Sequence, residues 1–166
     1  MTTSTSPLRI IYIVGAGRSG STVLDTVLGN HPDAVSVGEL SNLHRSGWVN
    51  NEFCACGEPA DGCGFWNEVR SAWLNANRGA DVEDYLAMQA RFERFRPAAM
   101  WRTEASSLFR TAAARRYLAQ TGSLYESIAA VSRRRVIVDS SKTPLRARWL
   151  ARLPDRKSTR LNSSHW

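Results

Sequence analysis

The stretch LRIIYIVGAGRSGST occupies residues 8–22 of the chain. Its first seven residues are mostly apolar and β-branched, which is typical of a strand buried on both faces of a sheet. The glycine-rich residues 15–20 predict a loop. Residues 21–28 predict a short helix with Val23 and Val27 among its inward-facing side chains. A buried strand, a glycine loop and a helix in this order favour an α/β fold.

Two further segments resemble this pattern. Residues 34–37 predict a second short strand, which ends at Gly38 and Glu39. Residues 135–138 predict a third strand, followed by a polar loop and by a helix that begins at Pro144. Strands that alternate with helices predict a parallel sheet flanked by helices.

The residues between the second and third strands are mainly helical in pattern. We expect helices over residues 65–74, 82–95 and 98–120, and a further helix to Arg133 with Thr121 as its N-cap. Residues 46–64 are rich in Asn, Gly and Cys, and here we expect an irregular segment.

The composition excludes several classes of protein. The chain has 166 residues, 43% of them hydrophobic, and a formal charge of +7, which fits one domain. The longest apolar run, residues 10–14, is too short to cross a bilayer or to act as a secretory signal. The arginines are spread along the chain rather than interleaved with aromatics, so we expect no nucleic-acid partner. We expect a cytoplasmic protein without a membrane span.

The glycine loop has the spacing of several phosphate-binding loops. The separation of Gly15 and Gly20 fits a nucleoside triphosphatase loop, but Ser21 stands where that loop needs lysine. The pattern G-x-G-x-x-G is also satisfied, and Glu39 follows at the distance of a ribose-binding acid, so a Rossmann-type dinucleotide-binding oxidoreductase is one alternative. Neither motif explains the arginine and the hydroxyl side chains of the loop. Those groups suit a terminal sulfonyl group.

The loop resembles the 5′-phosphosulfate-binding loop of sulfotransferases that use 3′-phosphoadenosine 5′-phosphosulfate (PAPS), above all the bacterial and tyrosylprotein enzymes. Further similarity lies in Asn-His-Pro-Asp at residues 30–33, in Val-Gly-Glu at residues 37–39 and in Lys-Thr-Pro at residues 142–144. The resemblance implies a sheet like that of P-loop nucleoside triphosphatases. It also implies PAPS as sulfonyl donor, 3′,5′-adenosine bisphosphate as product, and a small-molecule or peptide acceptor.

The resemblance implies a role for each matching residue. Glu39 would be the general base, and Lys142 would contact the transferring group. The donor would be bound by six loop residues: Gly17, Arg18, Ser19, Gly20, Ser21 and Thr22. A non-catalytic nucleotide-binding module is the remaining alternative.

The end of the chain departs from the family pattern. In that family an arginine after the next strand and a serine on the following helix bind the 3′-phosphate, and this sequence stops before them. Residues 155–165 read DRKSTRLNSSH, which resembles a translated sequencing adapter and has no strand period. We therefore interpret residues 1–154 as the N-terminal portion of one sulfotransferase domain and residues 155–166 as a non-native tail. The expectation is an inactive fragment that lacks the C-terminal part of the sheet.

Cysteines and aromatic residues provide two secondary hypotheses. Cys54, Cys56 and Cys63 are one ligand short of a structural zinc site, which His44 could complete. The C-x-C spacing is tighter than usual for zinc, so we expect no metal; a disulfide is the other alternative. A similar cysteine-and-tryptophan segment occurs in some bacterial members of the family.

Five aromatic residues could form either part of the core or an acceptor pocket: Tyr85, Phe92, Phe95, Trp101 and Phe109.

Overall fold

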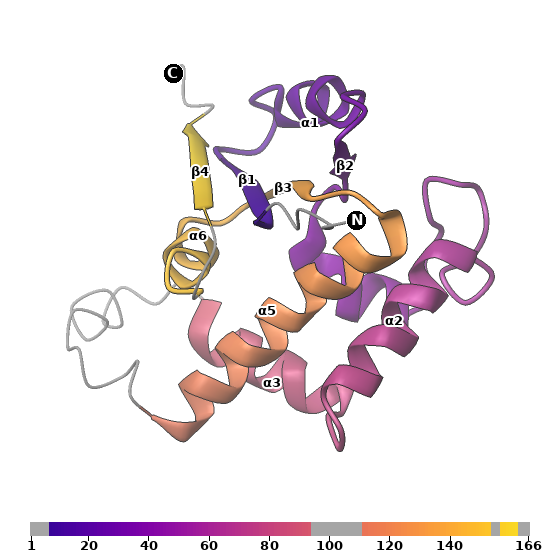
Figure 1. Ribbon diagram of the computed structural model, residues 1–166, viewed down its shortest axis with the longest axis vertical. Coiled ribbons are helices and arrows are strands. Elements are labelled where there is room, and N and C mark those ends of the chain that lie inside the picture. The colour runs from indigo at the N-terminus through magenta and orange to yellow at the C-terminus, as the bar shows by residue number, and fades with distance from the viewer. Residues whose placement is uncertain (1–6, 94–110, 154–156, 163–166) are drawn as a thin grey trace, which may run out of the picture.

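The computed structural model describes residues 7–93, 111–153 and 157–162, the last segment by its backbone alone. Four parallel strands form one sheet in the order β2-β3-β1-β4 (Figure 1). Their bounds are β1 Arg9–Val14, β2 Ala34–Ser36, β3 Val136–Lys142 and β4 Lys157–Asn162. The predicted α/β fold with a parallel sheet is confirmed.

Strands β1 and β3 form the centre of the sheet because their side chains are buried on both faces. Ile10 and Ile13 of β1 are 1% and 0% exposed, and Ile137 and Val138 of β3 are both 0% exposed. The two strands pair in parallel from Arg9 opposite Val136 to Tyr12 opposite Asp139, and the register then shifts so that Val14 lies opposite Lys142. The apolar sequence of both strands is what a parallel sheet covered on each face requires.

The helices are divided unequally between the two faces of the sheet. Helix α1, Ser21–Gly29, packs its Leu24 and Leu28 against Ile13 and Val138 on one face. The opposite face carries the larger core, which Figure 1 shows as a layer of helices below the strands. This layer consists of α2 Gly64–Ala76, α3 Val82–Glu93, α5 Ala112–Ser132 and α6 Pro144–Leu150, with the short turns η1 Leu40–Asn42 and η2 Leu43–Val49.

Helix α5 corrects the predicted break at Thr121. The helix is continuous through this residue, whose hydroxyl lies 3.1 Å from the Tyr85 hydroxyl inside the core. Tyr117, Leu124 and Ile128 are fully buried along the same helix face. A buried stripe with helical period therefore outweighs the capping tendency of an isolated threonine. The N-cap is Thr111, which accepts a hydrogen bond from the amide of Ala114.

Several other expectations differ from the structure. Val23 and Val27 of α1 are 68% and 61% exposed, so they do not face inward as predicted. Strand β3 continues to Lys142, further than the pattern indicated, and the π-helical turn η2 extends into the segment predicted to be irregular. Residues 94–110, which include the end of the helix predicted over 82–95 and the start of the helix predicted over 98–120, lie outside the described part of the chain. None of the described helices is long and apolar enough to cross a membrane.

Strand β4 lies in the segment that we expected to have no regular structure. Its backbone pairs in parallel with β1, from Lys157 opposite Arg9 to Asn162 opposite Val14. Backbone groups on the open edge of β1 can pair with almost any extended segment, whatever its side chains. The position beside β1 is thus filled, which corrects the expectation that this part of the sheet is missing.

Candidate functional site

Glu39 and Lys142 meet at the carboxyl end of the sheet. Glu39 lies shortly after β2, and Lys142 is the last residue of β3, which neighbours β2. The Lys142 ammonium forms an ion pair with the Glu39 carboxylate, whose other oxygen accepts a hydrogen bond of 3.1 Å from the Asn42 amide. The Glu39 side chain remains 43% exposed. The structure therefore brings both predicted catalytic residues together, with the carboxylate open to solvent.

The glycine loop joins this pair through the backbone. Val14 is paired with Lys142 across the β1–β3 ladder, and the Gly15 amide donates a hydrogen bond of 3.5 Å to the Lys142 carbonyl. Arg18 and Gly20 both have left-handed backbones, with φ of 63° and 75°. Successive amides in such a turn form a concave site for an anion.

Helix α1 begins directly after this turn. Gly20 is its N-cap, and no side chain caps the helix or places an acid in its first turn. The first amides of a helix attract anions when nothing else satisfies them. Arg18 is exposed beside them. The loop can therefore accept an anionic group.

The hydroxyls of the loop do not all face solvent. Thr22 is exposed and Ser19 is partly exposed, but Ser21 is only 2% exposed. Ser21 can therefore offer its backbone amide to a ligand more readily than its hydroxyl. Gly17 has open space around it, since a Cβ added there would meet nothing within 4 Å.

Asp25 is a buried carboxylate beneath the loop that the sequence did not reveal. Its Oδ2 atom accepts hydrogen bonds from the hydroxyls of Ser36, at 2.8 Å, and Ser140, at 3.3 Å. Its Oδ1 atom is buried without a partner. Burial raises the pKa of this carboxyl above its ordinary value. Asp25 thus connects α1 to β2 and β3, through partners 11 and 115 positions away that no local pattern encodes.

A second buried network supports β3 from the opposite face. Arg146 of α6 is fully buried and pairs with Glu93 at 2.7 Å and with Asp139 at 3.6 Å. The Tyr117 hydroxyl donates to Glu93, and the Tyr125 hydroxyl donates to Asp139. Burial raises the pKa of both tyrosines well above the ordinary value. The network fixes the end of β3 that carries Lys142.

An open pocket of about 350 Å³ lies beside the Glu39–Lys142 pair. Its lining includes Asn42, the partner of Glu39, and Thr143, the neighbour of Lys142. Gln89 and Glu93 contribute polar groups, and Arg45 adds a positive charge. The pocket lining itself includes neither Glu39 nor Lys142.

Comparison with protein-family models, with curated proteins and with solved structures finds no match.

Two expectations about aromatic residues have different outcomes. Tyr85 and Phe92 are 0% and 3% exposed and belong to the core, so they do not line the pocket. Phe95, Trp101 and Phe109 lie outside the described residues.

His44 is not a metal ligand together with the cysteines. It is 1% exposed and stacks on Tyr85 with ring centroids 4.0 Å apart, with Trp48 at 4.5 Å and Trp73 at 5.2 Å. Burial, and next the charge of Arg146, lower the pKa of His44 well below its ordinary value. A neutral histidine in an aromatic cluster has a packing role.

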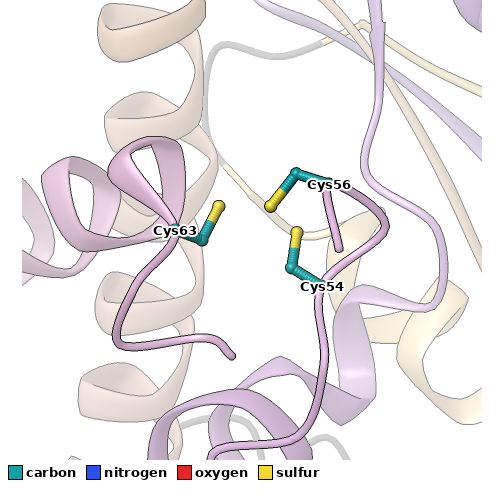
Figure 2. Close-up of side chains that lie close together, drawn as sticks. All are labelled: Cys54, Cys56 and Cys63. Carbon is teal, nitrogen blue, oxygen red and sulfur yellow. The ribbon is translucent and has the colours of Figure 1, made fainter. Parts of the chain in front are cut away.

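Cys54, Cys56 and Cys63 converge in space, as Figure 2 shows. Their sulfur atoms all lie within 4.8 Å of one another. The backbone amide of Glu58 donates a hydrogen bond that lowers the pKa of the exposed Cys56 thiol.

Proposed function

We propose that the protein is a sulfotransferase that moves a sulfonyl group from PAPS to an acceptor hydroxyl or amine. Its sheet would be of the P-loop type. One observation carries this proposal: Glu39, Lys142 and the glycine loop meet at the carboxyl end of three neighbouring parallel strands. Ligands of open α/β sheets bind at this end. Lys142 pairs with a carboxylate that can accept a proton, and Arg18 adds a second cation in the loop between β1 and α1.

The backbone at both cations supports a binding role. Arg18 and Lys142 have φ values of 63° and 67°, a conformation that is uncommon for residues other than glycine. Strained backbone of this kind concentrates at sites that bind ligands. The β1–β3 ladder holds Lys142 in place by pairing it with Val14.

The strand order disfavours the dinucleotide alternative. In dinucleotide-binding folds the first two strands of the sheet are neighbours, and the acid after the second strand binds a ribose. Here β3 lies between β1 and β2. The Glu39 carboxylate, moreover, is engaged by Lys142 and Asn42. Glu39 is therefore better suited to proton transfer than to ribose binding.

The residues divide the reaction between them. The Glu39 carboxylate takes the proton of the acceptor hydroxyl while the acceptor oxygen forms its bond to sulfur. The bond between sulfur and the bridging phosphate oxygen breaks, and 3′,5′-adenosine bisphosphate leaves with the electron pair. The loop amides, Arg18 and Lys142 stabilise the negative charge on the sulfonyl and phosphate oxygens.

Binding of the donor tests this proposal without knowledge of the acceptor. Calorimetric titration should show that the chain binds PAPS, and that Arg18→Ala weakens binding about tenfold or more, since a hydrogen bond to a charged group contributes about 1.5–3 kcal/mol. Adenosine 5′-phosphosulfate, which has no 3′-phosphate, probes the loop by itself. Arg78→Ala removes an exposed arginine from the turn after α2 and should leave the affinity unchanged.

The same titration can contradict the proposal. If the folded chain binds a nicotinamide or flavin dinucleotide but binds neither PAPS nor adenosine 5′-phosphosulfate, it is a dinucleotide-binding protein. Equal effects of Arg18→Ala and Arg78→Ala would show that the loop is not the binding site.

A further inference from the structure

The segment between η2 and α2 folds its three cysteines toward one point. The amide of Cys54 donates a hydrogen bond of 2.8 Å to the Glu58 carbonyl, and the amide of Gly57 donates one of 2.9 Å to the Cys54 carbonyl. Gly57 has a φ of 91°, which a residue with a side chain rarely adopts. This tight turn brings the thiols of Cys54 and Cys56 close together.

Cys63 comes to the same point from the start of α2. It is the N-cap residue of that helix, and its amide donates a hydrogen bond of 3.1 Å to the Pro59 carbonyl. Phe53 and Pro59 form an isolated bridge that closes the segment between the cysteines. Figure 2 shows the three side chains pointing toward one another from the turn and from the helix.

Hydrophobic packing does not explain this convergence. Cys56 is exposed and Cys54 is only partly buried, while Cys63 alone is buried, at 5% exposure. Sulfur atoms around one zinc ion lie about 3.8 Å apart, given Zn–S bonds of about 2.3 Å in a tetrahedron. The sulfur atoms of the three cysteines all lie within 4.8 Å of one another, which is close to that spacing. A disulfide, with sulfurs about 2 Å apart, would join two thiols and leave the third unexplained.

We propose that Cys54, Cys56 and Cys63 bind a thiophilic divalent cation of the Zn²⁺ class. Within the described residues, no other histidine, cysteine or carboxylate joins the three thiols, so solvent takes the fourth tetrahedral position. Each thiol loses its proton on binding, so one bound Zn²⁺ releases up to three protons. The metal ties the turn at residues 54–57 to the first turn of α2. Its role is to stabilise this segment, and it is independent of sulfonyl transfer.

Metal binding by the 166-residue chain tests the proposal directly. Protein purified under reducing conditions with added ZnSO₄ and then dialysed should retain about one Zn²⁺ per chain by mass spectrometry. Co²⁺ added to the metal-free, reduced protein should produce thiolate-to-cobalt charge-transfer bands. Cys56→Ser should weaken Zn²⁺ binding at least tenfold without loss of fold by circular dichroism, because this side chain is exposed. Ala55→Ser introduces a serine at the neighbouring exposed residue and should leave both the Zn²⁺ affinity and the fold unchanged.

Three results would overturn the proposal. The first is a reduced, folded chain that retains no zinc and shows no charge-transfer band. The second is equal Zn²⁺ affinity in Cys56→Ser and Ala55→Ser. The third is a native disulfide whose thiols, once reduced, bind neither Zn²⁺ nor Co²⁺. Each readout is a property of the metal, so failure here leaves the sulfotransferase proposal unaffected.

Discussion

Glu39 and Lys142 neutralise each other in the described arrangement, and this contact has a consequence for donor binding. The ammonium that should hold an anionic donor is already paired with a carboxylate. A donor must therefore compete with Glu39 for Lys142 and approach a negative charge. The pair is partly exposed, so its electrostatic effect is modest.

Glu39→Gln should therefore bind PAPS more tightly than the wild type, by about 1.4- to fivefold, in keeping with the about 0.2–1 kcal/mol of exposed ion pairs. Lys142→Ala should weaken binding instead. Calorimetric titration measures both effects, with the exposed Glu68→Gln of α2 as the control for loss of one negative charge. If Glu39→Gln binds PAPS more weakly than the wild type, the carboxylate contacts the donor favourably. That result would contradict its role as the base for the acceptor.

His44 makes the stability of the fold depend on pH. Because its pKa is lowered in the folded state, the unfolded chain binds a proton below about pH 6.5 that the folded chain does not. The free energy of unfolding should then fall by about 1.4 kcal/mol for each pH unit below about 6.5.

Urea unfolding of His44→Phe between about pH 5 and about pH 7.5 should give a flatter profile than the wild type. The exposed His31→Gln should keep the wild-type slope. An unchanged slope in His44→Phe would mean that His44 can be protonated inside the aromatic cluster.

Helices α3, α5 and α6 are joined to β3 through Arg146 rather than by apolar packing alone. Glu93 ends α3, Asp139 lies in β3, and Tyr117 and Tyr125 belong to α5. Removal of one partner from a buried ion pair leaves an uncompensated charge, which costs about 3–5 kcal/mol. This network therefore determines how firmly the end of β3 is held.

Arg146→Met should lower the free energy of unfolding by about 3–5 kcal/mol, because it leaves Glu93 and Asp139 buried without their cation. Addition of Glu93→Gln to this variant should recover part of the loss. Arg148→Met, on the same helix but partly exposed, should cost less than about 1 kcal/mol. Urea denaturation measures all three variants. A cost below about 1 kcal/mol for Arg146→Met would contradict the network.

Some of these elements were predictable from sequence, and others were not. Strands β1, β2 and β3 and helix α1 follow from local apolar runs and from glycine residues, whereas the choice of Glu39 and Lys142 depended on the resemblance to PAPS-dependent sulfotransferases. The Arg146–Glu93 pair joins residues 53 positions apart, and no local pattern encodes such a contact. The continuity of α5 through Thr121 likewise depends on a distant partner, Tyr85.

The sheet as a unit depends on what covers the edge of β1. Strand β4 pairs along the full length of β1, and without it those backbone groups would be open to another chain. The low apolar content of residues 157–162 hid this strand from sequence reasoning, since backbone pairing leaves no periodic signal.

A chain that ends at Leu153 should consequently be less stable and should self-associate through β1. Urea denaturation and analytical ultracentrifugation measure the two effects. A chain in which Gly and Ser replace residues 157–162 keeps the length but loses strand propensity, and it should behave like the truncated chain. If the truncated chain remains monomeric and equally stable, β4 does not pair with β1 in solution.

The opposite end of the sheet offers a competing site for anions. There a pocket of about 340 Å³ is lined by Arg9, Arg133, Arg134 and Arg135, at the amino ends of the strands. With a formal charge of +7, the chain could hold a phosphorylated ligand at this end by charge alone. The location of the donor therefore distinguishes the proposed site from general electrostatic attraction.

Amide chemical-shift mapping with PAPS is the most direct measurement. In ¹H–¹⁵N spectra of the labelled chain, the amides of residues 15–22 and of Lys142 should shift in a saturable way, and those of Arg133 and Arg135 should not. Saturable shifts confined to the arginine pocket, or none at all, would contradict a phosphosulfate site at the glycine loop.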